Sequence, residues 1–335
     1  VHDFIPLVYR QDYLDKTPDF RRHYLAKLEE LKKSAGIITI SGSSFREAVE
    51  LLGISPDIMV NASEAADPKF RRLELSAADR QDMRRRFGLE KPFVFYTGGS
   101  DPRKNLPRLI QAFARLPAEL RERHQLVLAG SMPELDRTAL KDEARRQGLP
   151  RDALKFLGYV GDDALIRLYN LAELFVFPSL HEGFGLPCLE AFQCGTAVLG
   201  ADASSLPEVI GNAEALFDPL SVADMAAKMQ AVLSDAGLRA SLAEEGARQA
   251  ARFSWERSGG LALAALRKAA AVREGRQDWA AARARVERCQ QRLLEALAKL
   301  PQQPARPEEH DLMQVAQAMA RNRTAAEARL RAGKL

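Results

Sequence analysis

The stretch LFVFPSLHEGFGLPCLEAFQCG, residues 174–195, lays out a strand, a loop and a helix in that order. The apolar run 174–177 predicts a buried strand. Pro187 suits the first turn of a helix, because its missing N–H costs nothing there, and Gly195 suits the position just past the helix end. We therefore expect a strand that enters a helix through a glycine-containing loop.

Two acids bracket this loop, Glu182 before the glycines and Glu190 inside the helix. Backbone N–H groups at the start of a helix attract anions, because the helix dipole is positive there. The N–H groups expected to face a ligand are those of Gly183, Phe184, Gly185 and Leu186. Carboxylate oxygens accept hydrogen bonds from hydroxyls. Two acids beside an anion cradle therefore predict a sugar nucleotide as the ligand.

The surrounding sequence alternates between strand-like and helix-like segments. We expect strands at residues 93–97, 125–129, 154–160, 174–177, 196–200 and 215–217. Helices are expected between them, at residues 106–116, 133–147, 162–171 and 206–210. Buried strands that alternate with helices predict an α/β fold, a Rossmann-like parallel sheet covered on both faces. Ligands of such sheets bind at the carboxyl ends of the strands, where the loops beginning at Gly98 and His181 both lie.

The loop at Gly98 reads Gly-Gly-Ser-Asp-Pro-Arg-Lys-Asn and places Arg103 and Lys104 in a turn before a helix. Transfer of a sugar from a nucleotide sugar leaves negative charge on a diphosphate, which cations aimed at its oxygens stabilise. Some sugar-transferring enzymes hold a metal ion with an Asp-x-Asp motif, and the sequence contains none. The alternative interpretation of this segment is a solvated basic turn.

The spacing of Glu182 and Glu190 around Gly-Phe-Gly, together with the Pro-Arg-Lys-Asn turn, resembles the signature of retaining family 4 glycosyltransferases of the GT-B fold. The resemblance implies that Glu182 lies beside the transferred sugar and that Glu190 binds the ribose hydroxyls. It also implies that the basic turn, from Gly98 and Gly99 to Lys104, binds the diphosphate. Many family members carry an arginine where this chain has Gly99, which leaves the share of Arg103 open and favours Lys104.

Further residues match the family pattern with two interpretations open. His2 resembles a histidine that faces the donor sugar across the cleft, and it fits a structural role equally. The segment 204–208, Ser-Ser-Leu-Pro-Glu, resembles a loop near the donor and also fits an ordinary helix cap. Tyr159 and Val160, at the end of a predicted strand, are candidates for the wall around the nucleobase. His181 is expected to shape its loop, and the remaining histidines are expected at the surface: His23, His124 and His310.

The resemblance also divides the chain. It implies the C-terminal part of the acceptor-side domain at 1–85, a complete nucleotide-sugar-binding domain at 86–255, a crossover helix at 256–272 and a helical tail at 273–335. In the first part we expect a helix at 19–33, a strand at 36–40 and a helix at 44–52 capped by Ser43 or Ser44. The tail shows a short heptad stripe from 279 to 300, a proline-rich linker at 301–307 and a last helix from about 311.

The sequence begins with Val1 rather than Met, and its tail resembles segments that join glycosyltransferase modules in large bacterial proteins. We therefore expect a fragment of a longer enzyme with a neighbouring glycosyltransferase module, a fragment that can be inactive alone. The net charge of +4 is too balanced to indicate nucleic acid as a partner, and no apolar run is long enough to span a membrane. The three cysteines form neither a metal-binding nor a disulfide pattern, which indicates core thiols in the cytoplasm. Peripheral association with a membrane is a separate expectation.

The function expected from the sequence is a retaining, metal-independent transfer of a hexose from a GDP-, UDP- or dTDP-sugar, without any cofactor. The acceptor would be a glycan or a lipid-linked sugar in surface polysaccharide synthesis, for which mannose and rhamnose are common in similar proteins. A phosphorylase of the same fold would need a pyridoxal-binding lysine in a much longer chain, and epimerases lack this combination of motifs. Two alternatives are kept: a non-catalytic nucleotide-sugar-binding or scaffold module of a larger enzyme, and a nucleotide-sugar epimerase of the same fold.

Overall fold

The computed structural model describes residues 1–274 and residue 291 of the chain. Residues Val1–Ala271 form one compact unit, which holds the sheet and the candidate site described below. The predicted heptad stripe, proline-rich linker and last helix, with Cys289 and His310, lie outside the described residues.

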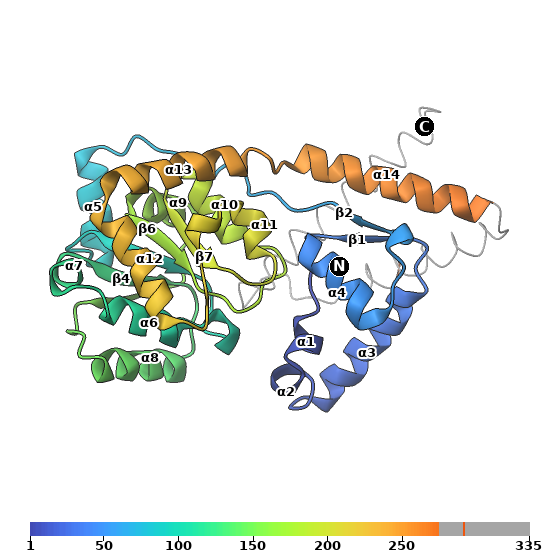
Figure 1. Cartoon of the computed structure of the whole chain (residues 1–335), viewed down its shortest axis with the longest axis horizontal. Helices are drawn as coiled ribbons and strands as arrows, with labels where there is room; N and C mark the ends of the chain where they lie inside the picture. The colour runs from blue at the N-terminus through green and yellow to red at the C-terminus, as the bar shows by residue number, and fades with distance from the viewer. Residues whose placement is uncertain (275–290, 292–335) are drawn as a thin grey trace. The chain divides into compact units, whose positions relative to one another are not determined.

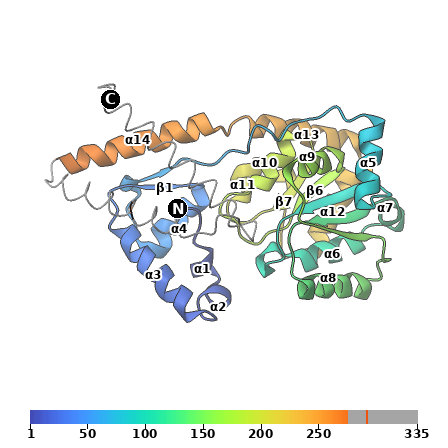
Figure 2. The same cartoon turned by 180° about the vertical axis from the view of Figure 1, so that it is seen from behind.

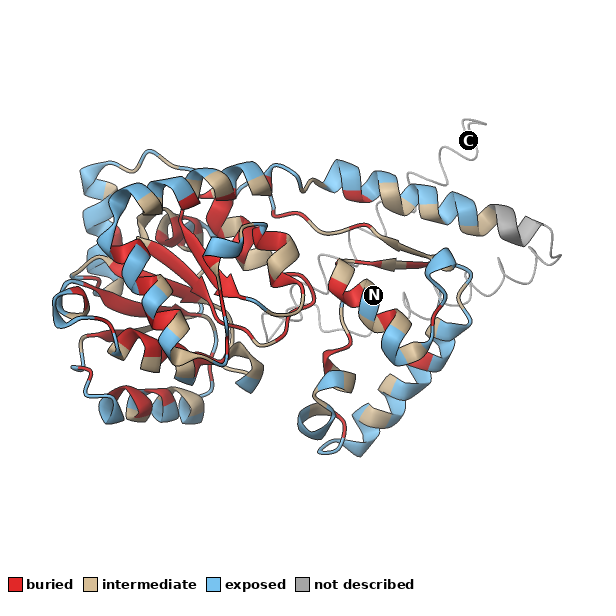
Figure 3. Ribbon diagram, in the orientation of Figure 1, coloured by how far each residue is buried: buried red, intermediate tan, exposed pale blue. Residues whose placement is uncertain are grey.

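A six-stranded parallel sheet forms the centre of the larger part of this unit (Figure 1). The strands stand in the order β5-β4-β3-β6-β7-β8, and each pairs in parallel with its neighbours. Their bounds are β3 Phe93–Thr97, β4 Gln125–Ala129, β5 Leu154–Gly158, β6 Leu174–Phe177, β7 Val198–Ala201 and β8 Leu216–Phe217. Figure 3 shows the inner strands β4, β3, β6 and β7 as buried, as the apolar sequence runs predict, whereas in the edge strand β5 only Leu154 is buried.

The strand order reverses between β3 and β6. The chain first builds outward from β3 through β4 to β5, and then returns to the other side of β3 with β6. The pairing of Val94 with Leu174 fixes the register of these two strands. Loops at such a reversal diverge from one another, which opens a crevice at the carboxyl ends of the strands. The loops that follow β3 and β6 are those that carry the predicted cations and Glu182.

Helices cover both faces of the sheet. Figures 1 and 2 show α6 (Leu106–Ala114) and α8 (Glu134–Arg146) on one side, and α9 (Asp162–Leu171), α10 (Leu186–Gln193) and α13 (Ala236–Ala250) on the other. The apolar residues of α6 recur at helical spacing, so that Leu109, Ile110 and Phe113 are all fully buried. The remaining helices of this part are α5 Ala77–Phe87, α7 Ala118–Arg123, α11 Leu206–Ile210 and α12 Val222–Ser234, with short 3-10 turns η2 Pro102–Lys104 and η3 Ala213–Ala215.

The first 61 residues build a smaller lobe around a separate apolar cluster of Phe4, Leu28, Ile37, Ala48 and Ile54. Its two strands, β1 Ile37–Thr39 and β2 Met59–Asn61, pair in parallel. Its helices are α1 Ile5–Val8, α2 Arg10–Tyr13, α3 Pro18–Lys32 and α4 Gly42–Leu52, with the 3-10 turn η1 at Pro56–Ile58.

The predicted start of α4 was wrong by two residues. The helix begins at Gly42, and its N-cap is Ser41 rather than Ser43 or Ser44. Ser41 has extended backbone angles, and its hydroxyl oxygen accepts the N–H of Ser44 at 2.9 Å. The helix ends at Gly53, which adopts the left-handed conformation that favours glycine there.

The last described helix, α14, runs from Trp255 to Glu274, where an apolar helix was predicted. In the described part of the chain, no helix combines the length and apolar character that a membrane crossing requires.

Candidate functional site

The basic turn after β3 is held by Asp101 within the turn and by Tyr13 from the smaller lobe. Asp101 Oδ1 accepts the N–H of Arg103 at 3.1 Å, and the other oxygen of Asp101 accepts the hydroxyl of Tyr13 from the smaller lobe at 2.5 Å. Gly98 has a φ of +143°, and a Cβ there would lie 2.6 Å from the Tyr96 hydroxyl oxygen. The turn therefore requires glycine at its start.

The Glu182 loop after β6 is held by two serines from the start of α11. The Glu182 N–H donates to Ser204 Oγ at 2.8 Å. Ser205 Oγ lies 3.0 Å from the Glu182 carbonyl oxygen and 2.6 Å from that of Phe184, and donates to this pair. Ser205 occupies the N-cap position of α11 without making a side-chain cap. The interpretation of this segment as an ordinary helix cap was therefore wrong, because its hydroxyls bind the neighbouring loop.

Three of the predicted site residues meet at the crevice between β3 and β6. Lys104 Nζ lies 2.5 Å from Glu182 Oε1, and Arg103 Nη1 lies 3.1 Å from Glu182 Oε2. The three side chains are between 11% and 18% exposed, so water screens these charges only in part. Arg103 also donates to the carbonyl oxygen of His181 at 2.8 Å, and Lys104 Nζ lies 5.1 Å from the centre of the Phe177 ring. The sequence predicted these residues at one site without indicating that they pair.

Glu190 lies in α10 and is oriented by a residue that sequence reasoning missed. The fully buried Tyr169 of α9 donates its hydroxyl to Glu190 Oε2 at 2.9 Å. Burial raises the pKa of the Glu190 carboxyl above its ordinary value. Nothing in the sequence links a tyrosine on an apolar helix face to an acid in the following helix, so this partner could not be found in advance.

The glycine loop presents free backbone donors, as predicted. In the part of the chain that the structure describes, the N–H groups of residues 183–186 donate no hydrogen bond. Gly185 has a φ of +119°, directly before α10, and a Cβ at Gly183 would lie 2.8 Å from the His2 carbonyl oxygen. Both positions therefore need glycine. Pro187 in the first turn and Gly195 just past the helix end are confirmed.

His2 is brought next to this loop by the smaller lobe. Its carbonyl oxygen accepts the Ser44 hydroxyl at 2.7 Å, while its side chain is 80% exposed and lies 3.7 Å from Glu64 Oε1. His181, by contrast, is buried, and its Nε2 lies 2.9 Å from Glu47 Oε1 of α4. A role for His2 at the donor sugar stays a prediction.

His124 does not lie at the surface, contrary to the prediction. It is fully buried just before β4, where Nδ1 lies 2.7 Å from the Leu120 carbonyl oxygen and Nε2 lies 3.0 Å from Glu173 Oε2. The two acceptors compensate for the loss of water around the ring. His23 is exposed, as expected.

Tyr159 and Val160 do not end a strand, because β5 stops at Gly158, whose φ is +68°. The left-handed glycine breaks the pairing with β4 two residues before the predicted end. Tyr159 is 80% exposed and follows the outermost strand of the sheet. Its contact with a nucleobase stays a prediction.

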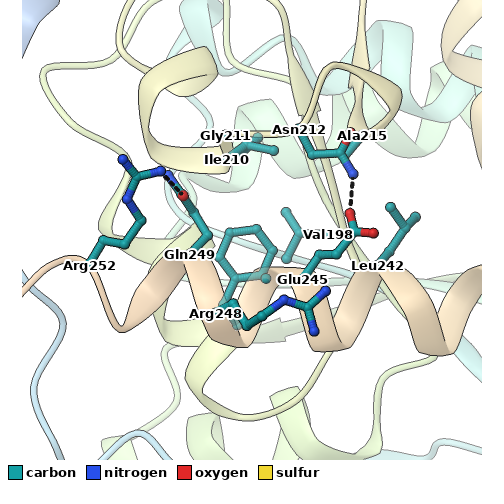
Figure 4. A pocket seen from close by; sticks show the side chains of 12 residues that line it. Val198, Ile210, Gly211, Asn212, Ala215, Leu242, Glu245, Arg248, Gln249 and Arg252 are labelled. Atoms are coloured by element: carbon teal, nitrogen blue, oxygen red, sulfur yellow. Dashed lines mark hydrogen bonds between the residues drawn. The ribbon is translucent and has the colours of Figure 1, made fainter.

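A hollow of about 240 Å³ lies apart from these residues, between α10, α11 and α13 (Figure 4). Its polar side chains bind one another: Asn212 donates to Glu245 at 2.5 Å, and Arg252 donates to Gln249 at 3.2 Å. None of the predicted site residues lines it.

Among the described residues, no group of three or more histidines, cysteines or acids is arranged to hold a metal ion. Cys188 and Cys194 are buried free thiols, in agreement with the predicted core role.

Comparison with known proteins identifies the class of protein that carries this fold and site. The family model for glycosyl transferases group 1 matches residues 79–249, just over half of the chain. The chain therefore belongs to the group 1 glycosyltransferase family.

The chain is similar to mannosyltransferases of Escherichia coli. It is 41% identical over 262 residues to a serotype-specific mannosyltransferase WbdA, an alignment that covers 78% of this chain and 32% of that protein. It is 35% identical over 244 residues to an O-antigen chain mannosyltransferase B, covering 71% of this chain and 62% of that protein. The chain thus spans about a third of the length of the first relative.

Among solved structures, the chain resembles HepE of Anabaena in complex with UDP and glucose, with a TM-score of 0.61 and 20% identity over 69% of this chain and 62% of that one. This similarity confirms the predicted GT-B fold class.

Proposed function

We propose that the chain is a retaining, metal-independent glycosyltransferase module that transfers mannose from a nucleotide sugar to a glycan or lipid-linked acceptor. The observation that carries the proposal is the convergence of Arg103 and Lys104 on Glu182, at the crevice where the strand order reverses. The names of both relatives, which are mannosyltransferases, support mannose as the sugar, and the name of the second, an O-antigen chain mannosyltransferase, supports surface polysaccharide as the product.

The two cations would bind the diphosphate of the donor. As the bond from the sugar to the phosphate breaks, negative charge grows on the leaving diphosphate, and preorganised cations stabilise that charge. Lys104 and Arg103 are 13% and 18% exposed, so their charge acts in a partly dry environment where it counts for more than in water. Two such cations perform the electrostatic part of the work that a metal ion performs in other sugar-transferring enzymes.

The glycine loop and the two glutamates would hold the remaining parts of the donor. The free N–H groups of residues 183–186 suit sugar and phosphate oxygens. Glu182, held by Ser204 and Ser205, lies where the transferred sugar would meet the cations. Glu190, with one oxygen held by Tyr169, keeps acceptor capacity for the ribose hydroxyls.

Retention of configuration would follow from attack on the same face that the diphosphate leaves. A phosphate oxygen of the leaving group accepts the proton of the acceptor hydroxyl while the new bond to the sugar forms. Glu182 is engaged by two cations, which suits an electrostatic partner of the sugar better than a nucleophile. The two-carboxylate scheme of retaining glycosidases is therefore not part of the proposal.

We place the reaction in the cytoplasm, at the inner face of the membrane.

Calorimetric titration with GDP-mannose, UDP-glucose and dTDP-rhamnose, each with and without EDTA, tests the proposal. We expect one donor to bind with or without EDTA, and GDP-mannose to transfer its sugar to an O-antigen acceptor. A strict need for Mg²⁺ or Mn²⁺ would contradict metal independence. Binding without any turnover, also in a longer protein that contains this chain, would support a non-catalytic nucleotide-sugar-binding module, and the absence of binding for all three donors would overturn the proposal.

A further inference from the structure

Asn105, directly after Lys104, has an unusual conformation for its environment. Its backbone lies in the left-handed region, with φ +60° and ψ +29°, although it is not a glycine. Its side chain is buried, with the residue only 2% exposed. It stands at the N-cap position of α6, where asparagine commonly binds the first N–H groups of the helix, and yet it makes no such bond. Its amide therefore makes its hydrogen bonds outside the cap of α6.

The Asn105 side chain joins three loops at the carboxyl edge of the sheet. Its Nδ2 donates to the carbonyl oxygen of Pro178, at 3.1 Å, and to that of Pro219, at 2.8 Å. Pro178 begins the Glu182 loop after β6, and Pro219 follows β8. Its Oδ1 accepts from Arg108 Nη1 at 2.9 Å. The buried amide thus donates two hydrogen bonds through Nδ2 and accepts one through Oδ1.

A backbone bond reinforces the same junction. The N–H of Leu180 donates to the Arg103 carbonyl oxygen at 2.7 Å. The basic turn is therefore attached to the Glu182 loop on both sides of Lys104, once through Arg103 and once through Asn105. The ion pair of Lys104 with Glu182 spans the two loops between these attachments.

From this geometry we infer that Asn105 is a positioning residue that fixes the Lys104 ammonium, and with it the diphosphate site, relative to the Glu182 loop. The inference rests on the proposed function, since it concerns the diphosphate of the same donor. Asparagine suits the position for two reasons together. It tolerates the left-handed backbone better than most residues, and its amide supplies two donors to two buried carbonyls. Glycine offers only the first property, and longer amides offer only the second.

The test compares Asn105→Gly with Asn105→Ala, in the whole chain. Both variants lose the amide, but alanine adds the strain of a left-handed backbone, so it should unfold more easily. If the amide positions Lys104, both variants should bind the nucleoside diphosphate about tenfold more weakly, the size expected for a lost hydrogen-bonded support. An affinity loss that followed stability, larger in alanine than in glycine, would overturn the inference.

Gln125 provides a matched control at the opposite edge of the sheet. Its buried amide also joins separate segments, since Nε2 donates to the Asp152 carbonyl oxygen at 2.9 Å and Oε1 accepts the N–H groups of Glu90 and Lys91. Gln125→Ala should therefore lower the melting temperature as the Asn105 variants do, without changing the affinity for the nucleoside diphosphate. Equal affinity losses in both would show a general structural role for Asn105 and contradict positioning.

A double-mutant cycle gives a second readout, the coupling between Asn105 and Lys104 in nucleoside diphosphate affinity. A purely structural role of Asn105 would produce no such coupling. If Asn105 acts through Lys104, adding Asn105→Gly to Lys104→Ala should weaken nucleoside diphosphate binding by less than about twofold further. If the effects of the two substitutions on the binding free energy were additive, the two residues would act independently, which would overturn the inference. The two failures are distinguishable: a wild-type chain that binds no nucleotide contradicts the proposed function, whereas normal binding by Asn105→Gly contradicts only the role of Asn105.

Discussion

Lys104 Nζ lies 2.5 Å from Glu182 Oε1, so the cation expected to bind the donor diphosphate is paired with the acid expected to serve the transferred sugar. Arg103 contacts the other oxygen of the same carboxylate at 3.1 Å. In this arrangement the single negative charge of Glu182 is shared between the two cations, which leaves a net positive charge on the three side chains. A diphosphate that binds here must share these cations with Glu182 or replace it, and the predictions for the two residues are therefore coupled.

Lys104→Ala should reduce affinity for the nucleoside diphosphate. The substitution removes a charge-assisted contact worth roughly 1.5–3 kcal/mol, which corresponds to about a tenfold to hundredfold loss of affinity. Calorimetry with the bound nucleotide measures the effect. Lys91→Ala is a matched control, because Lys91 pairs with Asp152 at 3.1 Å outside the site and should bind the nucleotide normally. Unchanged affinity in Lys104→Ala would contradict the assignment of the basic turn to the diphosphate.

Glu182→Gln should separate binding from turnover. Glutamine keeps the shape of the side chain but lacks the negative charge that competes with a diphosphate for Arg103 and Lys104, so the nucleoside diphosphate should bind at least as tightly as it does to the wild type. Turnover of the intact donor should fall, because the interaction with the developing positive charge on the sugar is lost. Weaker nucleoside diphosphate binding would show that Glu182 contacts the nucleotide itself, against our division of roles.

Glu190→Gln should weaken the nucleoside diphosphate and the intact donor alike, since a ribose contact is common to both. The pH dependence tests the same contact. Burial raises the pKa of the Glu190 carboxyl, so it takes up a proton at a higher pH than an ordinary glutamate, near 4.3. Affinity of the wild type should therefore begin to fall on acidification above that ordinary range, and Glu190→Gln should lack this step. Titrations between about pH 4.5 and 7.5 measure it; the same profile in both proteins would contradict the assignment.

The sequence predicted the parts of the site that depend on local pattern. Some features depend only on a few neighbouring residues: the glycines in turns, the proline in a first helical turn and the apolar strands. The loops of Arg103 and Glu182 could therefore be placed at one edge of the sheet. Contacts made over long sequence distances could not be predicted. The attachment of Glu182 to Ser204 and of Glu190 to Tyr169 depends on how the strands are ordered, which local pattern does not state.

Two wrong predictions have physical reasons of the same kind. The segment 41–44, Ser-Gly-Ser-Ser, offers three similar hydroxyls as the cap of α4, and the backbone angles at Ser41 decide among them. His124 was expected at the surface because the sequence shows no partner for it, but a carbonyl group and Glu173 bind its two ring nitrogens in the interior. Burial of a polar residue depends on its partners, which lie elsewhere in the sequence.

The pair of His124 and Glu173 should make stability depend on acid pH. The hydrogen bond from His124 holds the pKa of the Glu173 carboxyl below its ordinary value, so the folded state releases this proton more readily than the unfolded chain. The resulting stability is present above the ordinary glutamate pKa and is lost as the pH falls through the lowered value of the folded state. Glu173→Gln should lower the free energy of unfolding by roughly 1–3 kcal/mol at neutral pH and by less near pH 3. Urea unfolding at both pH values measures this difference.

Glu244→Gln, at an exposed position, is the control and should change little at either pH. An equal loss for Glu173→Gln at both pH values would show that the charge of the Glu173 carboxylate does not contribute to stability at this position.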